Sequence, residues 1–184
     1  MIENEKIILG IDPGTNVLGY GVVAKKGNII IPLTLGVLKL GKYDDQYTKL
    51  KHIFRRVNNL IKEYKVEEMA LEAPFFGKNV QSMLKLGKAQ GVAMAAGLNN
   101  DILIFEYAPR KIKMAITGNG NASKEQVALL LKSILKLKKL PDDLDATDGL
   151  ATAVCHCYQN KTLPGGSSYT GWKDFLSKNP NRKA

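Results

Sequence analysis

The sequence predicts a single α/β domain built on a mixed β-sheet with helices on both faces. Three strand-like segments precede the first helical pattern, and helices and strands alternate after it. That order combines an antiparallel start with parallel strands joined by helical crossovers. A chain of 184 residues with 45% hydrophobic residues is long enough for one well-buried domain and too short for two large ones.

The first three segments favour strands. Residues 6–12 and 19–25 are apolar, and a Lys-Gly-Asn turn at 26–28 leads into a third apolar run over 29–40. Short connections of this kind join antiparallel neighbours. We therefore expect a three-stranded antiparallel meander.

The pattern then changes to alternating helices and strands. Apolar residues recur at helical spacing over 47–64, and a strand-like run over 66–73 stops at Pro74. Residues 80–98 predict a helix unusually rich in Gly and Ala, and 102–107 predict a short buried strand. The small-residue face of the 80–98 helix suits close approach either to the sheet or to a second copy of the chain.

Two more helices complete the domain. Ser123 and Gln126 have capping-box spacing, and Leu140-Pro141 is expected to end the helix that they begin. Its predicted apolar stripe is Val127, Leu130, Leu131, Ile134 and Leu137. A final helix is expected over 145–158. A mixed five-stranded sheet, with its first three strands antiparallel and helices on both faces, fits a ribonuclease-H-like fold better than a doubly wound parallel one.

Net charge and composition limit the kinds of partner that the chain is expected to bind. The chain has 27 Lys and Arg against 17 Asp and Glu, a net charge of +10, which suggests a polyanionic partner, although each basic cluster alone could be a solvated helix face. No apolar run approaches the length of a membrane span and the N-terminus is not a secretory signal, so we expect a cytoplasmic protein with no membrane partner. We expect one domain over 1–159 and a basic, flexible tail over 160–184.

The two cysteines flank a histidine in Cys155-His156-Cys157. This spacing is not that of a structural zinc site, and no second ligand pair accompanies it. We expect reduced cysteines within a helix.

Asp12 is the first candidate functional residue. It ends an apolar run in LGIDPGTNVLGYGVV (9–23) and precedes a Pro-Gly-Thr turn. The turn could cradle phosphates, as in actin-like and sugar-kinase ATPases; Asp12 could be a metal ligand on the first strand of a nuclease; or the residues could simply suit a turn. Those ATPases have two lobes with a phosphate turn in each, and the sequence holds no second Asp-x-Gly-Thr.

Three further acids occupy the ends of predicted elements. Glu72 ends a strand, and Asp145 and Asp148 lie on one side of a first helical turn. Helix capping accounts for one of this pair but not for four acids at element ends. Four carboxylates held together repel one another unless cations neutralise them, and Mg²⁺ prefers such oxygen ligands. Two such ions could clamp an in-line phosphodiester displacement.

Four segments carry a resemblance to a known family: LGIDPGTNVLGYGVV, ALEAPFFGKNVQSMLKLGKAQGVAMAA, FEYAPRKIKMAITGNGNASKEQV and DATDGLATAVCH. Together they resemble the bacterial RuvC Holliday-junction resolvases over about residues 7–158. The resemblance implies that Asp12, Glu72, Asp145 and Asp148 are catalytic metal ligands. It implies Mg²⁺, with Mn²⁺ as a substitute and two ions per site, and paired symmetric nicks in opposed strands during recombination and repair.

The same resemblance implies DNA contacts. Phe75 falls where the family stacks an aromatic ring on a base, with burial in the core as its alternative. Lys113 and Lys124 match basic residues near the family's active site, where Lys124 would also serve catalysis; surface solubility is the alternative, more for Lys113 than for Lys124.

Partners follow from the resemblance as well. It implies a homodimer on four-way junction DNA, working with the RuvA and RuvB branch-migration proteins, and we assign the 80–98 helix to the dimer interface. The segment 137–144 looks slightly longer than in relatives, which leaves its path open. Two other functions stay open: a junction-binding protein without catalysis, and a related nuclease that acts on RNA.

Overall fold

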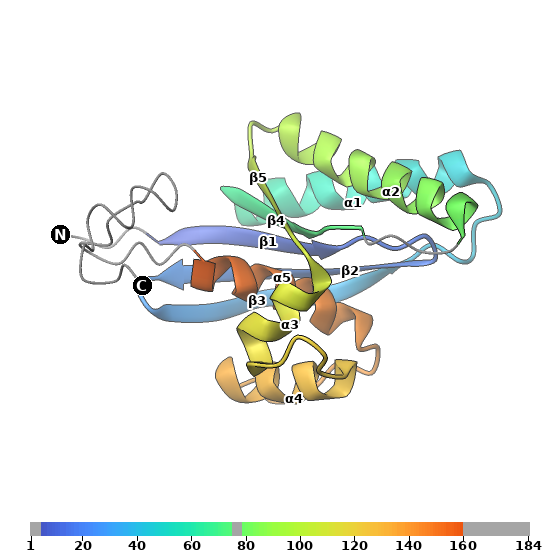
Figure 1. Ribbon diagram of the computed structural model, residues 1–184. Coiled ribbons are helices and arrows are strands. Elements are labelled where there is room, and N and C mark those ends of the chain that lie inside the picture. Colours follow the sequence, from blue (N-terminus) through green and yellow to red (C-terminus); the bar gives the residue numbers. More distant parts are fainter. Residues whose placement is uncertain (1–4, 75–78, 160–184) are drawn as a thin grey trace, which may run out of the picture.

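The structure is a computed structural model that describes residues 5–74 and 79–159. Its centre is a five-stranded sheet in the order β3-β2-β1-β4-β5 (Figure 1). The strands are β1 (Lys6–Asp12), β2 (Val17–Lys26), β3 (Ile29–Lys39), β4 (Glu68–Glu72) and β5 (Leu103–Tyr107). The first three pair antiparallel, whereas β4 pairs parallel with both β1 and β5. The predicted mixed sheet is confirmed, with every strand end within two residues of its expected position.

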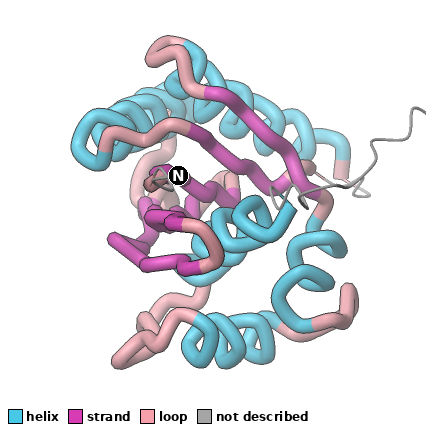
Figure 2. Tube along the Cα trace, turned by 90° about the vertical axis from the view of Figure 1, so that its left-hand side faces the viewer, coloured by secondary structure: helices cyan, strands magenta, loops and turns pink. Residues whose placement is uncertain are grey.

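Helices cover both faces of the sheet, as predicted (Figure 2). On one side lie α1 (Gln46–Tyr64) and α2 (Val80–Leu98), and on the other lie α3 (Pro109–Thr117), α4 (Lys124–Ile134) and α5 (Asp145–Gln159). Each face has its own hydrophobic core, and alternate residues of the central strands feed the two cores.

Helix α3 was not predicted from the sequence. Pro109 begins it, because a proline suits the first helical turn, and Gly118 ends it in a left-handed conformation with φ 73°. Ile112 and Ile116, one turn apart, are its buried residues. The segment is short and basic, so its helical periodicity rests on this one pair.

Helix α4 ends earlier than the predicted stop at Leu140-Pro141, and only part of its predicted apolar stripe is buried. The helix ends at Ile134, because Lys136 turns left-handed at φ 52° and the Leu137 N–H donates to the Lys132 carbonyl. Val127 and Leu131 are buried as expected, and Leu137 packs at the edge of the core. In contrast, Leu130 and Ile134 remain 40% and 38% exposed. Helix α5 packs against the side of α4 that carries Val127 and Leu131, so these residues are buried and Leu130 and Ile134 are not.

Helix α2 uses its small residues on two different faces. Ala89, Ala93, Ala96 and Gly97 are buried in the intramolecular core, which confirms packing against the sheet for that face. Its other face carries a stripe of exposed apolar and small residues, which we call the α2 stripe: Val80, Leu84, Gly87, Gly91, Ala95 and Leu98. These positions recur every three or four residues, so they share one side of the helix.

Helix α5 lies on the sheet at unusually close range. A methyl group on Gly10 of β1 would lie 2.2 Å from the Gly149 carbonyl oxygen, and one on Gly19 of β2 would lie 2.0 Å from the Asp145 carbonyl oxygen. Glycine therefore has a steric function at these contacts, since any side chain would push the helix away. The consequence is that the first turn of α5 is fixed next to the end of β1.

The far end of α5 carries a buried polar network. The His156 ring is fully buried, with Nε2 2.8 Å from Glu68 Oε2 and Nδ1 2.6 Å from the Tyr107 hydroxyl. The flanking Cys155 and Cys157 are buried free thiols, which confirms the expected reduced cysteines. In the described part of the chain, no helix is long and apolar enough to cross a bilayer.

Candidate active site

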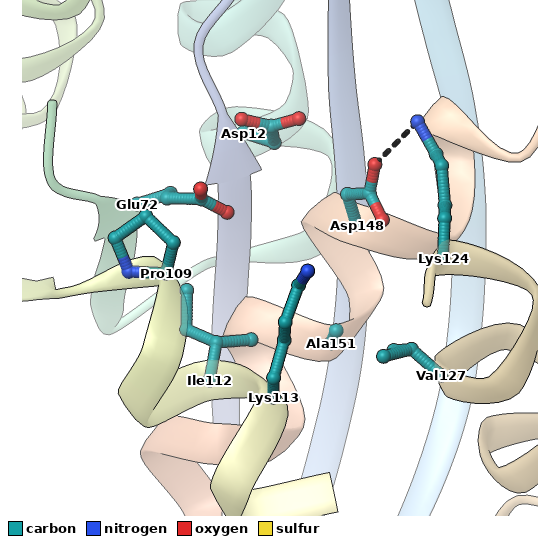
Figure 3. Close-up of a pocket in the computed structure, with 9 residues that line it drawn as sticks. All are labelled: Asp12, Glu72, Pro109, Ile112, Lys113, Lys124, Val127, Asp148 and Ala151. Atoms are coloured by element: carbon teal, nitrogen blue, oxygen red, sulfur yellow. Dashed lines mark ion pairs between the residues drawn. The ribbon is translucent and has the colours of Figure 1, made fainter. Parts of the chain in front are cut away.

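Two carboxylates lie at one edge of the sheet because their strands are parallel neighbours. Asp12 ends β1 and Glu72 ends β4, and the ladder between the strands pairs Ile11 with Leu71, the residues just before the two acids. Parallel strands end at the same edge, so both side chains reach the same space (Figure 3). The register alone accounts for this half of the site.

Helix α5 adds the other two predicted acids. Asp12 pairs with Gly19 in the β1–β2 ladder, and the Asp145 backbone packs on Gly19. Asp145 and Asp148 both lie in the first turn of α5. The close glycine contact thus brings the first turn of α5 to the end of β1, and Asp148 points into the same space as Asp12 (Figure 3).

Asp12, Glu72 and Asp148 line one open cleft. Its lining is Asp12, Glu72, Pro109, Ile112, Lys113, Lys124, Val127, Asp148 and Ala151. Asp145 lies at its margin, joined to it through Lys124. The apolar wall of Pro109, Ile112, Val127 and Ala151 was not predicted from the sequence. For Ile112 and Val127 the helical spacing was the available signal, but it indicates burial and not which cleft the residue borders.

The cleft strongly favours positive charge. Burial, and then the nearby Glu72 and Asp148 carboxylates, raise the pKa of Asp12 to about 8. Burial and Asp148 raise the pKa of Glu72 to about 7, and burial also raises the pKa of Asp148. Carboxylates with raised pKa values in one cleft are typical of functional sites, since a bound cation would relieve the repulsion between them.

Two lysines supply part of that charge. Lys124, the first residue of α4, forms ion pairs with Asp145 and with Asp148 Oδ2, the latter at 2.6 Å. Burial lowers the pKa of Lys124, but its hydrogen bonds to these two acids outweigh burial and raise it. Lys113 enters from α3, and its positive charge partly opposes the rise in the pKa of Glu72. Both predicted lysines therefore lie at the acid cluster, whereas Phe75 lies outside the described residues.

Comparison with known proteins decides the family. The sequence profile described as "Crossover junction endodeoxyribonuclease RuvC" matches residues 8–156. The chain belongs to the RuvC family. It is 58% identical to the RuvC of Christiangramia forsetii over 182 residues, covering 99% of this chain and 95% of that protein. It is also 58% identical to the Bacteroides fragilis RuvC, covering 97% and 96%.

Solved RuvC structures share the fold. The chain matches Thermus thermophilus RuvC in complex with a Holliday junction substrate with a TM-score of 0.78 and 33% identity, over 84% of this chain and 94% of that one. The yeast mitochondrial resolvase Ydc2 matches with a TM-score of 0.63 at 12% identity, a likeness of fold alone. The predicted ribonuclease-H-like fold is thus confirmed as that of RuvC.

RuvC proteins are metal-dependent nucleases, and this chain's donor set suits a hard cation. Among the described residues that line the cleft, the acidic side chains offer carboxylate oxygens to a metal, which Mg²⁺ and Mn²⁺ both accept. The pKa values of Asp12, Glu72 and Asp148 are all raised, so a positive charge there has a clear electrostatic benefit. Within residues 5–74 and 79–159, no three Asp, Glu, His or Cys side chains lie close enough together to hold a metal ion as they stand. The Lys124 ammonium lies between Asp145 and Asp148.

Proposed function

We propose that this chain hydrolyses phosphodiester bonds of four-way DNA junctions in the cleft of Asp12, Glu72 and Asp148. The observation that carries the proposal is that three partly buried carboxylates and two lysines line one cleft, in a chain of the RuvC family. A solved relative is in complex with a Holliday junction substrate. The expected product is a pair of symmetric nicks in opposed strands.

Asp12, Glu72, Asp145 and Asp148 would together hold divalent cations, Mg²⁺ or in its place Mn²⁺, two per site. When bound, such ions lower the pKa of a water nucleophile and stabilise the departing oxygen. The chain's part is to hold four carboxylates at fixed positions, by the β1–β4 register and by the glycine contact of α5.

Lys124 and Lys113 suit the DNA backbone. Lys124 stands at the N-terminus of α4, where free backbone N–H groups add to its attraction for a phosphate. Lys113 borders the cleft beside Glu72. We assign both to the scissile phosphate, with Lys124 also balancing the charge of Asp145 and Asp148. Phe75, three residues after Glu72, would stack on a base of the opened junction.

A junction with two-fold symmetry favours a dimeric enzyme, so we include a homodimer in the proposal. The α2 stripe is its interface, because an exposed line of small and apolar residues lets two helices approach closely. RuvA and RuvB are the expected partners for junction binding and branch migration, and the cytoplasm, where the DNA lies, is the expected location.

The test is cleavage of a mobile synthetic junction, beside linear duplex and RNA–DNA hybrid, with Mg²⁺ and with EDTA. We expect paired nicks in the junction alone and only with metal. Asp12→Asn should lower the rate by about a hundredfold or more while junction binding persists. Asp101→Asn, the same change at an exposed position with φ 56°, should cleave normally.

Three outcomes would contradict the proposal. Full activity of Asp12→Asn would remove that residue from the site. Tight junction binding without cleavage would leave a binding protein, and preferential cutting of the hybrid would indicate a nuclease that acts on RNA.

A further inference from the structure

The edge strand β3 carries an exposed apolar surface that the proposed function does not use. Ile29, Ile31 and Leu33 are 63%, 47% and 42% exposed; we call these three residues the β3 strip. Their neighbours Ile30 and Leu35 pack against the core under α5. Because side chains alternate along a strand, Ile29 and Ile31 face the opposite side of the sheet from Ile30, the side of α1 and α2. Leu33 lies at the register shift opposite Val22 and Val23, after which Leu35 lies on the α5 side.

Neither helix on that side provides the β3 strip with its main cover. Helix α1 packs chiefly against α2 and also on β1, whereas the helix that packs on β3 is α5, from the other face. Pro32 and the register shift already interrupt backbone pairing along this edge. The large apolar side chains of the β3 strip are still exposed, and soluble proteins usually cover such a patch.

The end of α5 brings a candidate cover close. The Lys25 ammonium donates to the Cys157 carbonyl at 2.8 Å, and Lys25 pairs with Ile30 in the β2–β3 ladder. The last turn of α5 therefore lies beside the strand that carries the strip. Residues 160–168, which follow, can span up to roughly 30 Å when extended, enough to pass around the sheet edge from one face to the other.

Residues 169–176, which follow this connecting segment, have the apolar and aromatic composition of a docking segment. Leu163 aside, the large apolar and aromatic residues of 160–184 are Tyr169, Trp172, Phe175 and Leu176, all within eight positions. Pro164-Gly165-Gly166 precedes them, and polar and basic residues follow. We propose that residues 169–176 of the same chain pack on the β3 strip and cover its exposed apolar side chains.

Trp172 makes the proposal directly measurable, because the sequence holds a single tryptophan. In the 184-residue chain without DNA or metal, we expect a blue-shifted Trp172 emission and protection from acrylamide. Ile31→Lys should move the emission to the red and increase the quenching constant, since a charge in the strip opposes apolar packing. Leu103→Lys is the matched control: this leucine is 61% exposed on β5, the opposite edge strand, and its variant should keep the native spectrum.

Far-UV circular dichroism and Tm check that both variants fold, and a double variant, Ile29→Lys with Ile31→Lys, provides a second measurement. A free-tryptophan spectrum in the native protein would overturn the proposal, as would native spectra in both strip variants. Protection of Trp172 that disappears on dilution would overturn it in favour of a second copy as the occupant. None of these readouts depends on nuclease activity, so they leave the proposed function unaffected.

Discussion

Helices α5 and α2 are both rich in small residues, yet they use them in opposite ways. In α5 the residues from Ala146 to Cys157 are buried except Asp148, and Gly149 meets the backbone of Tyr20. In α2 one face is buried, while Gly87 and Gly91 have open space where a side chain would stand. Small residues thus permit close approach without specifying a partner. The partner of α5 is the glycine-lined surface of β1 and β2, and the outer face of α2 has none within the described chain.

The largest loss of stability is expected when a side chain is added at the close contact between α5 and the sheet. In Gly149→Ala the new methyl group would lie 2.5 Å from the Tyr20 Cα, which is backbone and cannot yield. We expect a loss of about 3 kcal/mol in the free energy of unfolding, and reduced cleavage because Asp145 and Asp148 shift with the helix. Urea unfolding and junction cleavage measure the two effects. Native stability in this variant would show that α5 does not depend on the glycine contact.

The other end of α5 is expected to be the next most sensitive. His156→Gln should cost about 2 kcal/mol at pH 7.5, because it disturbs buried hydrogen bonds to Glu68 and Tyr107. Burial lowers the pKa of His156 and outweighs the opposing bond from Glu68. The unfolded chain therefore binds the proton first, and the stabilising contribution of His156 is present above about pH 6.5 and lost as the pH falls below it.

The difference in stability between the native protein and His156→Gln should accordingly shrink between pH 7.5 and pH 5. Comparing the two proteins cancels the titration of the acid cluster, which they share. Thermal unfolding across this range is the measurement. A difference that grows on acidification would reverse the sign that we assign to His156.

On α2 the expected effect is on association. Leu84, 56% exposed, lies within the α2 stripe, so Leu84→Lys should weaken dimerisation by about tenfold or more, since a buried ammonium would oppose the contact. Sedimentation measures the dissociation constant. Leu129→Lys is the control, because Leu129 is similarly exposed on α4. Equal association of both variants and the native chain would exclude the α2 stripe as the interface.

The smallest expected change in stability is at Gly91 of α2, and it tests the comparison of α2 with α5 directly. Gly91→Ala repeats the change made at Gly149, but here nothing lies within 4 Å of the new methyl group. At concentrations where the chain is monomeric, we expect a gain of about 0.5–1 kcal/mol, because alanine favours a helix over glycine. Chemical unfolding of the dilute protein tests this. A loss of stability would mean that the outer face of α2 already has an intramolecular contact.

The sequence predicts the acidic side of the cleft better than its apolar side. Asp12 and Glu72 end strands, and Asp145 and Asp148 begin a helix, so element boundaries alone indicate their shared edge. The apolar wall has no such marker. Ile112 belongs to a short helix whose periodicity rests on one pair of isoleucines, and Val127 shares α4 with an equally apolar stripe that the fold leaves exposed.

The same limit explains the other differences from expectation. Whether α4 buries Leu131 or Leu130 depends on how α5 packs against it, which is a long-range contact absent from any local pattern. The early end of α4 depends on Lys136, a residue with no intrinsic preference for the left-handed region. The site roles of Asp12, Glu72, Asp145, Asp148, Lys113, Lys124 and Phe75 stay predictions, which the proposed cleavage assay tests first at Asp12.

The position of α5 as the last described element determines when its two acids join the cleft during synthesis. Asp12 and Glu72 leave the ribosome early and lie on strands that pair with each other, whereas Asp148 arrives near the end of the described chain. A nascent chain that has already formed β1 and β4 still lacks two of its four acids. A protein able to cut DNA therefore acquires its full set of carboxylates only once synthesis of the domain is almost complete.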